Sequence, residues 1–244
     1  MNLFAAEWLK IRTLRSFWIC SVLGMVLGVA GAVLQGLAFS DPDLAKGVTA
    51  RDALTDVLGS GSAVLQIAIV VLSVLVLSSE YSGGAIRVTF VATPWRLRVM
   101  AAKALVVTAI ATVLASLSLT LGYAAAVPFL HQGDVAGTSL GIMLSLLGVE
   151  IGYCVLVALF AFAVTLAVRN TAAAVTITLG VVLLSTVVLT LLDLMLRTDL
   201  TSVSFSVVAS GVLTDPLSRA LPAVVAWLAV PAVLGGLALT RRDA

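Results

Sequence analysis

Residues 140–168 read LGIMLSLLGVEIGYCVLVALFAFAVTLAV, a continuous apolar run in which Glu150 is the one charged side chain. A bilayer core of about 30 Å needs roughly 20 helical residues, so this run can cross a membrane with length to spare for tilt. Backbone groups in hydrocarbon must be hydrogen-bonded within the protein, which leaves helices and closed barrels. Because barrel strands alternate apolar and polar residues and this run does not, it predicts a transmembrane helix.

Five further apolar runs of similar length take up most of the remaining sequence. The chain is 61% hydrophobic and 11% charged, against about 45–50% and 25% in soluble domains. We therefore expect an all-α polytopic membrane protein, with a single domain over residues 1–244. The six spans are predicted at residues 17–39, 57–77, 104–130, 140–168, 171–192 and 221–239.

The basic residues are concentrated on one side of this predicted topology. Ten of the fourteen lysines and arginines lie before the first span, between the second and third, between the fourth and fifth, or after the sixth: Lys10, Arg12, Arg15, Arg87, Arg96, Arg98, Lys103, Arg169, Arg241 and Arg242. The opposite loops carry most of the aspartates. By the positive-inside rule, both termini are expected in the cytoplasm. The net charge of +2 reflects this bias and indicates no nucleic-acid partner.

Residues 1–16 are too short and too charged to cross a membrane. Trp8 and several other apolar residues fall on one side of a helical wheel, with Lys10 and Arg12 around the other. This pattern is typical of a helix lying in the membrane interface. The alternative is an ordinary basic flank that orients the first span. The candidates for anchoring at the interface are Trp8, Lys10, Arg12, Arg15, Trp95, Arg96, Arg98 and Lys103.

The loop at residues 78–103 is longer than most connections between neighbouring helices, which indicates an ordered docking surface. Gly83 and Gly84 allow a sharp turn after the second span. Thr93 followed by Pro94 is a favourable N-cap and first-turn pair, so the next helix is predicted to begin there. Between these signals, residues 85–91 form a short segment presented to the cytoplasm.

With its amino-terminal EWLKIRTLRSFW (7–18), its loop SEYSGGAIRVTFVATPWRLRVMAAK (79–103) and its carboxy-terminal LALTRRDA (237–244), the chain resembles the permease subunits of ABC-2 type transporters. The resemblance extends over essentially the whole chain. It implies an elbow helix in residues 1–16, a coupling helix in residues 80–91, and a location in the bacterial cytoplasmic membrane. It also implies a second permease subunit, identical or different, and separate ABC ATPase subunits that hold ATP and Mg²⁺.

The resemblance makes the polar residues of the loop candidates for contact with the ATPase: Glu80, Tyr81, Gly83, Gly84, Arg87 and Thr89. The alternative for Arg87, Arg96, Arg98 and Lys103 is that they only enforce topology and bind anionic lipid, which would repel Glu80. The sequence has no G-x-x-x-x-G-K-[ST] phosphate-binding loop. The energy source is therefore expected to be another polypeptide or an ion gradient.

In the family, the second and fifth spans line the transport path. The path candidates here are Gln66, Thr178 and Thr186 on those spans, together with Glu150 on the fourth. They suit a hydrophobic or amphipathic small molecule or a lipid. Glu150 either faces a cavity or lies at the outer interface, if the span begins near residue 151. Gly24 and Gly28 form a G-x-x-x-G pair that permits close helix approach, within or between subunits.

No enzymatic or metal site is expected. The chain has one histidine and two cysteines, which are too few ligands for the usual zinc or di-iron sites, and no converging nucleophile and base. An exporter permease is the function that these patterns favour. A self-powered transporter or channel, or a non-transporting membrane scaffold, are the alternatives. Residues 194–220, outside the spans, are predicted to hold a partly embedded hairpin or amphipathic helix, with a solvated loop as the alternative.

Overall fold

The computed structural model describes residues 3–82, 96–132, 140–196, 199–214 and 220–241, and over these ranges it is all-helical, with no strand. A π-helical turn at Gly180–Leu184 joins α8 to α9, and a 3₁₀ turn at Thr201–Val203 precedes α10. The helices are α1 (Leu3–Arg12), α2 (Arg15–Ala38), α3 (Pro42–Ala45), α4 (Ala50–Ser82), α6 (Arg96–Gln132), α7 (Leu140–Val168), α8 (Thr171–Leu179), α9 (Ser185–Leu196), α10 (Phe205–Thr214) and α11 (Ala220–Arg241).

Five stretches of helix are long and apolar enough to cross a membrane: Arg15–Ala38, Ala50–Ser78, Val99–Gln132, Leu140–Val168 and Thr171–Leu196. The prediction of an all-helical protein with membrane-spanning helices is confirmed in this form. Each of the five coincides with one of the first five predicted spans. The sixth, at 221–239, falls within α11, whose described apolar part, Leu221–Gly236, is a shorter helix.

The helices extend further than the predicted spans at several ends. α4 begins at Ala50 instead of residue 57, because Thr49 caps it: the Thr49 hydroxyl accepts a hydrogen bond from the Asp52 backbone N–H (3.2 Å) and donates one to the Asp52 carboxylate (2.6 Å). The described part of α6 starts at Arg96, eight residues before the predicted start of its span at residue 104. Hydropathy marks where an apolar run ends, whereas backbone hydrogen bonds continue a helix beyond it.

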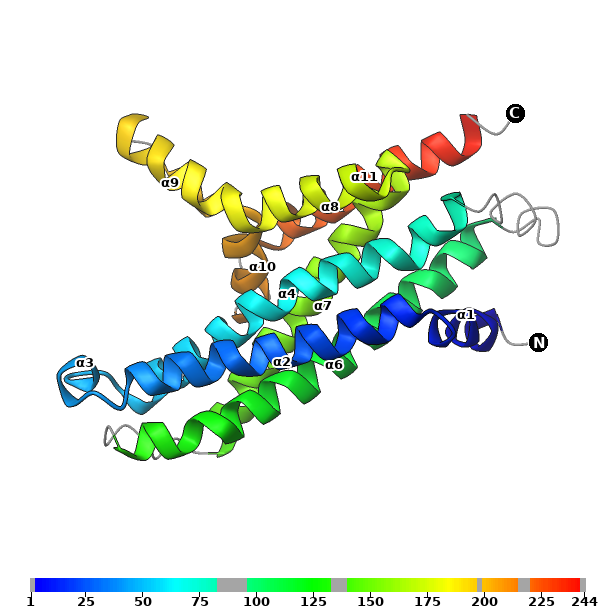
Figure 1. Ribbon diagram of the computed structural model, residues 1–244. Coiled ribbons are helices and arrows are strands. Elements are labelled where there is room, and N and C mark those ends of the chain that lie inside the picture. The colour runs from blue at the N-terminus through cyan, green and yellow to red at the C-terminus, as the bar shows by residue number, and fades with distance from the viewer. Residues whose placement is uncertain (1–2, 83–95, 133–139, 197–198, 215–219, 242–244) are drawn as a thin grey trace.

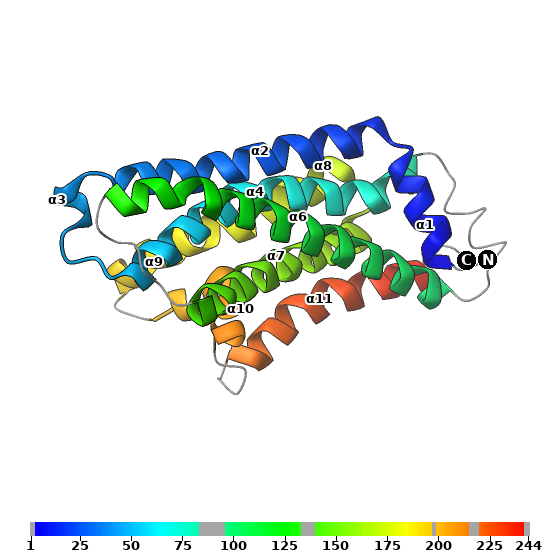
Figure 2. The same ribbon diagram turned by 90° about the horizontal axis from the view of Figure 1, so that it is seen from below.

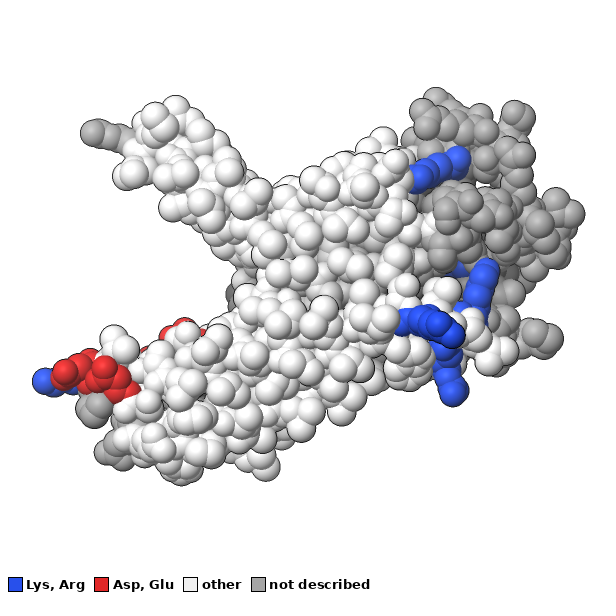
Figure 3. Space-filling model, in the orientation of Figure 1, with Lys and Arg blue, Asp and Glu red and all other residues white. Residues whose placement is uncertain are grey.

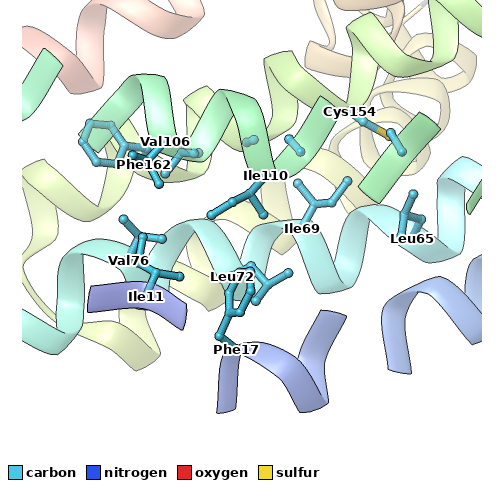
Figure 4. Close-up of a cluster of buried hydrophobic side chains, with 14 of the residues drawn as sticks. Ile11, Phe17, Leu65, Ile69, Leu72, Val76, Val106, Ile110, Cys154 and Phe162 are labelled. Atoms are coloured by element: carbon cyan, nitrogen blue, oxygen red, sulfur yellow. The ribbon is translucent and has the colours of Figure 1, made fainter. Parts of the chain in front are cut away.

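The core lies around α4, which packs against α2, α6 and α7. In Figure 4, Ile69 of α4 points toward Ile110 of α6 and Leu72 lies beside Phe17 of α2, within the largest cluster of buried side chains. Gly24 of α2 permits close contact with α4, since a Cβ there would lie 2.2 Å from the Cβ of Ala68. Gly28 does the same against α4 and α6. The glycine pair therefore serves packing within this chain.

The α8–α9 helix is the most exposed of the long apolar helices. Only 11% of its apolar window is buried, against 61% for α4, and α9 has no buried residue. Figure 1 shows α9 diverging from the ends of α2 and α4. Its apolar side chains thus have no partner over much of their surface within the described chain.

The segment 194–220, predicted as a hairpin or amphipathic helix, contains α10, which packs against α7 and α11. Phe205 of α10 is fully buried and stacks on Phe160 of α7 with ring centroids 4.8 Å apart. Trp227 of α11 packs edge-on against both rings, and its Nε1–H donates a hydrogen bond to the carbonyl of Val203 (3.1 Å). The alternative of a solvated loop does not describe residues 205–214.

The two ends of the molecule differ in charge. Figure 3 shows lysine and arginine side chains gathered at the end where α2 begins, and acidic side chains near α3 at the other end. α1, the end of α4, the beginning of α6 and the end of α11 all lie at the basic end (Figure 1). α1 is set steeply across the direction of α2 there (Figure 2). The chain thus brings its two termini to the same end.

Candidate functional site

Two side-chain hydrogen bonds join α4 to α7 within their apolar stretches. The Ser62 hydroxyl donates to Oε2 of Glu150 (2.5 Å), and the Tyr153 hydroxyl donates to Oε1 of Gln66 (3.0 Å). Ser62 and Gln66 are four residues apart on α4, and Glu150 and Tyr153 are three apart on α7. Each pair therefore lies on one face of its helix, so the two hydrogen bonds are stacked about one turn apart.

The polar cluster of Ser62, Gln66, Glu150 and Tyr153 is largely shielded. Ser62 and Gln66 are 3% and 4% exposed, and Glu150 is half-buried. Ser62 lies six residues from the exposed Asp56 on α4, about 9 Å along the helix at 1.5 Å per residue. Over the described residues, the partner of the Glu150 carboxylate is a hydroxyl and not a basic side chain. Such a polar group inside an apolar helix bundle marks a candidate functional site.

Gln66 and Glu150, both predicted from the sequence, are brought together here. Ser62 and Tyr153 are the members that sequence reasoning missed. The signal that could have found them is their spacing, because each lies one helical turn from a predicted polar residue on an otherwise apolar face. The cluster offers a carboxyl, two hydroxyls and an amide, which can hold a proton or hydrogen-bond a polar group of a ligand.

The other two predicted path residues lie elsewhere. Thr178 is fully buried on α8, on the face that also carries the buried Ala174 and Val182, and its hydroxyl has no hydrogen-bond partner in the described structure. Thr186 of α9 has its Oγ1 2.5 Å from the Ser206 hydroxyl of α10. The four predicted path residues are therefore divided between the polar cluster, the α8 packing face and the α9–α10 contact.

The predicted interface anchors differ in exposure. Lys10, Arg12 and Arg15 are exposed where α1 meets α2, and Trp8 packs against the main core cluster. The Trp18 Nε1–H donates a hydrogen bond to the Arg12 carbonyl (3.0 Å), which ties α1 to α2. Lys103 is fully buried on α6 and is engaged with a partner.

The predicted coupling residues fall at the edge of the described chain. Gly83, Gly84, Arg87, Thr89 and Trp95, together with the Thr93-Pro94 pair, lie outside the described residues. Glu80 and Tyr81 belong to the last turn of α4, and Arg96 and Arg98 to the first turn of α6, where the backbone is described and the side chains are not. The coupling site stays a prediction from the sequence.

The described residues contain no group of three or more His, Cys, Asp or Glu side chains that could hold a metal ion. Neither the models of known protein families nor the curated proteins give a match to this chain. Its fold and composition define a class, that of all-helical proteins with several helices able to span a membrane.

Proposed function

We propose that this chain is the permease subunit of an ATP-driven exporter of the ABC-2 type. It acts in a bacterial cytoplasmic membrane with six spans and both termini inside, as a homo- or heterodimer with separate ATPase subunits that bind ATP and Mg²⁺. Its cargo is a hydrophobic or amphipathic small molecule or a lipid. The resemblance in the three sequence stretches at 7–18, 79–103 and 237–244 supports this function.

The observation that carries the proposal is that the described parts of those three stretches lie together at one end of the molecule. The α1–α2 junction, the α4 and α6 ends that flank the coupling segment, and the end of α11 share the end rich in basic side chains. Because basic residues favour the cytoplasmic side, a cytoplasmic ATPase would meet all three together. The acidic end would then face away from the cytoplasm.

The continuity of α4 supplies a mechanical link. This helix runs unbroken from Ala50 to Ser82 through the middle of the core, so Glu80 and Tyr81, at the start of the coupling segment, lie on the same helix as Ser62 and Gln66 of the polar cluster. ATP binding by the partner subunit would displace the basic end of α4, and the displacement would reach Ser62 and Gln66. Their hydrogen bonds to α7 then become the contacts that break or re-form as the path opens.

Affinity purification tests the proposal. The tagged chain is extracted from its native membranes in mild detergent, and co-purifying ABC ATPases are identified and assayed for ATP hydrolysis. We expect a stoichiometric ABC ATPase, lost or uncoupled from transport in Glu80→Lys and Arg87→Glu and retained in the control Arg51→Gln at the acidic end. Purification without any ABC ATPase would contradict the proposal, and so would an ATPase that is retained and coupled to transport equally in all three variants.

A transporter driven by an ion gradient is the second candidate, and the Glu150 carboxyl in the polar cluster is the observation that favours it. Proton-coupled transport uses such intramembrane acids. Transport that follows the proton gradient, persists without any ATPase and disappears in Glu150→Gln would favour this function over the exporter.

A further inference from the structure

A cavity of about 260 Å³ lies at the basic end, between the α1–α2 junction, α4 and the start of α8. Figure 4 shows Ile11 of α1 and Phe17 of α2 directed toward Leu72 and Val76 of α4. These four side chains are buried and belong to the main core cluster. The lining is thus mainly apolar, and its hydroxyl groups come from Ser16, Ser78 and Thr171.

Basic residues adjoin the lining of this cavity in the sequence, at the basic end of the molecule. Arg12 follows the lining residue Ile11, Arg15 lies between the lining residues Leu14 and Ser16, and both arginines are exposed. Arg169 lies two residues before Thr171 on the turn from α7 to α8. The acids on the adjoining helix ends, Glu7 and Glu80, are outnumbered by these arginines and Lys10. An apolar cavity next to exposed guanidinium groups matches a ligand with a hydrocarbon part and an anionic head.

The aromatic residues beside the cavity place it at the level of the lipid headgroups. Trp18 is 52% exposed, one residue from Phe17 in the cavity wall. Exposed tryptophan next to arginine is typical of the boundary between hydrocarbon and headgroups. At that depth an anionic phospholipid is the ligand with the matching chemistry, and its phosphate can make bidentate hydrogen bonds with arginine.

We propose that the cavity between α1, α2, α4 and α8 is a binding site for one anionic phospholipid. The upper part of an acyl chain fills the apolar space beside Phe17 and Leu72. The phosphate lies over Arg12 and Arg15. The bound lipid wedges the α1–α2 junction against the basic end of α4 and stabilises the angle between α1 and α2. This site does not depend on the exporter assignment.

Native mass spectrometry of the purified full-length chain in detergent, with added phosphatidylglycerol or phosphatidylcholine, measures the binding. We expect wild-type protein to bind phosphatidylglycerol more tightly. Arg12→Gln combined with Arg15→Gln should weaken that binding by about 30-fold, roughly fivefold for each charge near the headgroups. Both arginines are exposed, so this variant should fold. The matched control, Lys46→Gln with Arg51→Gln at the acidic end, should bind as wild type.

A second variant separates the cavity from general charge attraction. Leu75 is a half-buried lining residue, and Leu75→Phe fills the space while leaving every charge in place. Its phosphatidylglycerol binding should fall by roughly tenfold or more, because the phenyl ring occupies the space that the acyl chain would fill, with an unchanged thermal unfolding midpoint because the cavity accommodates the ring. Inorganic phosphate and glycerol phosphate should not displace the lipid.

Three results would overturn the proposal. Equal affinity of wild-type protein for phosphatidylglycerol and phosphatidylcholine would show that the site does not recognise an anionic headgroup. Wild-type affinity of Leu75→Phe for phosphatidylglycerol would show that the lipid is held by charge at the surface and that its acyl chain does not occupy the cavity. Displacement of the lipid by inorganic phosphate would show an anion site without a role for the acyl chain.

Discussion

The hydrogen bond between Ser62 and Glu150 should be measurable as a coupling energy between α4 and α7. Replacing Ser62 with alanine removes the donor and leaves the half-buried carboxylate without its 2.5 Å partner. Losing a hydrogen bond to a charged group costs about 1.5–3 kcal/mol, whereas polar pairs between membrane helices average about 0.6 and reach about 1.7 kcal/mol. We therefore expect Ser62→Ala to lower the free energy of unfolding by about 1–2 kcal/mol.

Replacing the other partner, Glu150, should lower the free energy of unfolding much less. Glu150→Leu removes the carboxylate at similar volume, and the Ser62 hydroxyl can then donate to the Gly59 carbonyl, already 3.0 Å away. Ser62→Ala made in the Glu150→Leu background should cost less than about 0.5 kcal/mol, because no carboxylate is left without a donor. The difference between the two backgrounds is the coupling energy, about 1 kcal/mol.

Unfolding in mixed micelles with increasing SDS, followed by circular dichroism, gives the four free energies of this double-mutant cycle. The control is Ser116→Ala, since the Ser116 hydroxyl bonds to the Thr112 carbonyl of its own helix (2.6 Å) and bridges no helices. A coupling energy below about 0.3 kcal/mol, within the error to which independent sites add, would refute the hydrogen bond as a contact between α4 and α7.

Three further predictions concern individual contacts, two of packing and one of hydrogen bonding. Gly24→Ala should destabilise by about 3 kcal/mol or more, because its Cβ would meet that of Ala68, whereas Gly148→Ala, which meets nothing within 4 Å, should change unfolding by less than about 0.5 kcal/mol; equal effects would contradict the α2–α4 contact. Phe205→Ala should cost about 2–3 kcal/mol in the same assay, below the value for water-soluble cores because detergent solvates the unfolded apolar surface; an unchanged midpoint would argue against the aromatic cluster. The Asp193 carboxylate accepts hydrogen bonds from the backbone N–H groups of Leu200 (2.6 Å) and Thr201 (2.8 Å), so Asp193→Ala should speed hydrogen exchange at both amides by roughly 30-fold, and unaltered exchange would disprove that role.

The positions of the long apolar helices could be predicted from the sequence, because the length of each apolar run is the length of helix needed to cross a membrane. The predicted span 140–168 ends directly before Arg169 and Asn170, and α7 has the same bounds as the predicted span. Span limits drawn from hydropathy alone fall short of the helix ends elsewhere. α4 reaches Ser82, beyond the predicted end at residue 77, and α6 includes Arg96, before the predicted start at residue 104, because backbone hydrogen bonds continue a helix past its apolar residues.

The contacts between helices could not be predicted in the same way. Glu150 stood out as an acid in an apolar run, but its partner Ser62 is 88 residues away, and the rotation of two helices about their axes decides which side chains meet. The same holds for Gly24, because the G-x-x-x-G spacing with Gly28 permits close approach of another helix without specifying which helix. The structure pairs it with Ala68 of the same chain.

Cysteine labelling from the two sides of the membrane tests most directly the claim that the basic and acidic ends lie on opposite faces. Cys20 and Cys154 are first replaced with alanine, and single cysteines are placed at the exposed positions Ser16, at the basic end, and Asp43, at the acidic end. In spheroplasts, whose cytoplasmic membrane is intact, a membrane-impermeant maleimide should label Asp43→Cys at once. It should label Ser16→Cys only after the membrane is permeabilised. Labelling of both from one side, or of Ser16→Cys alone from outside, would contradict the account.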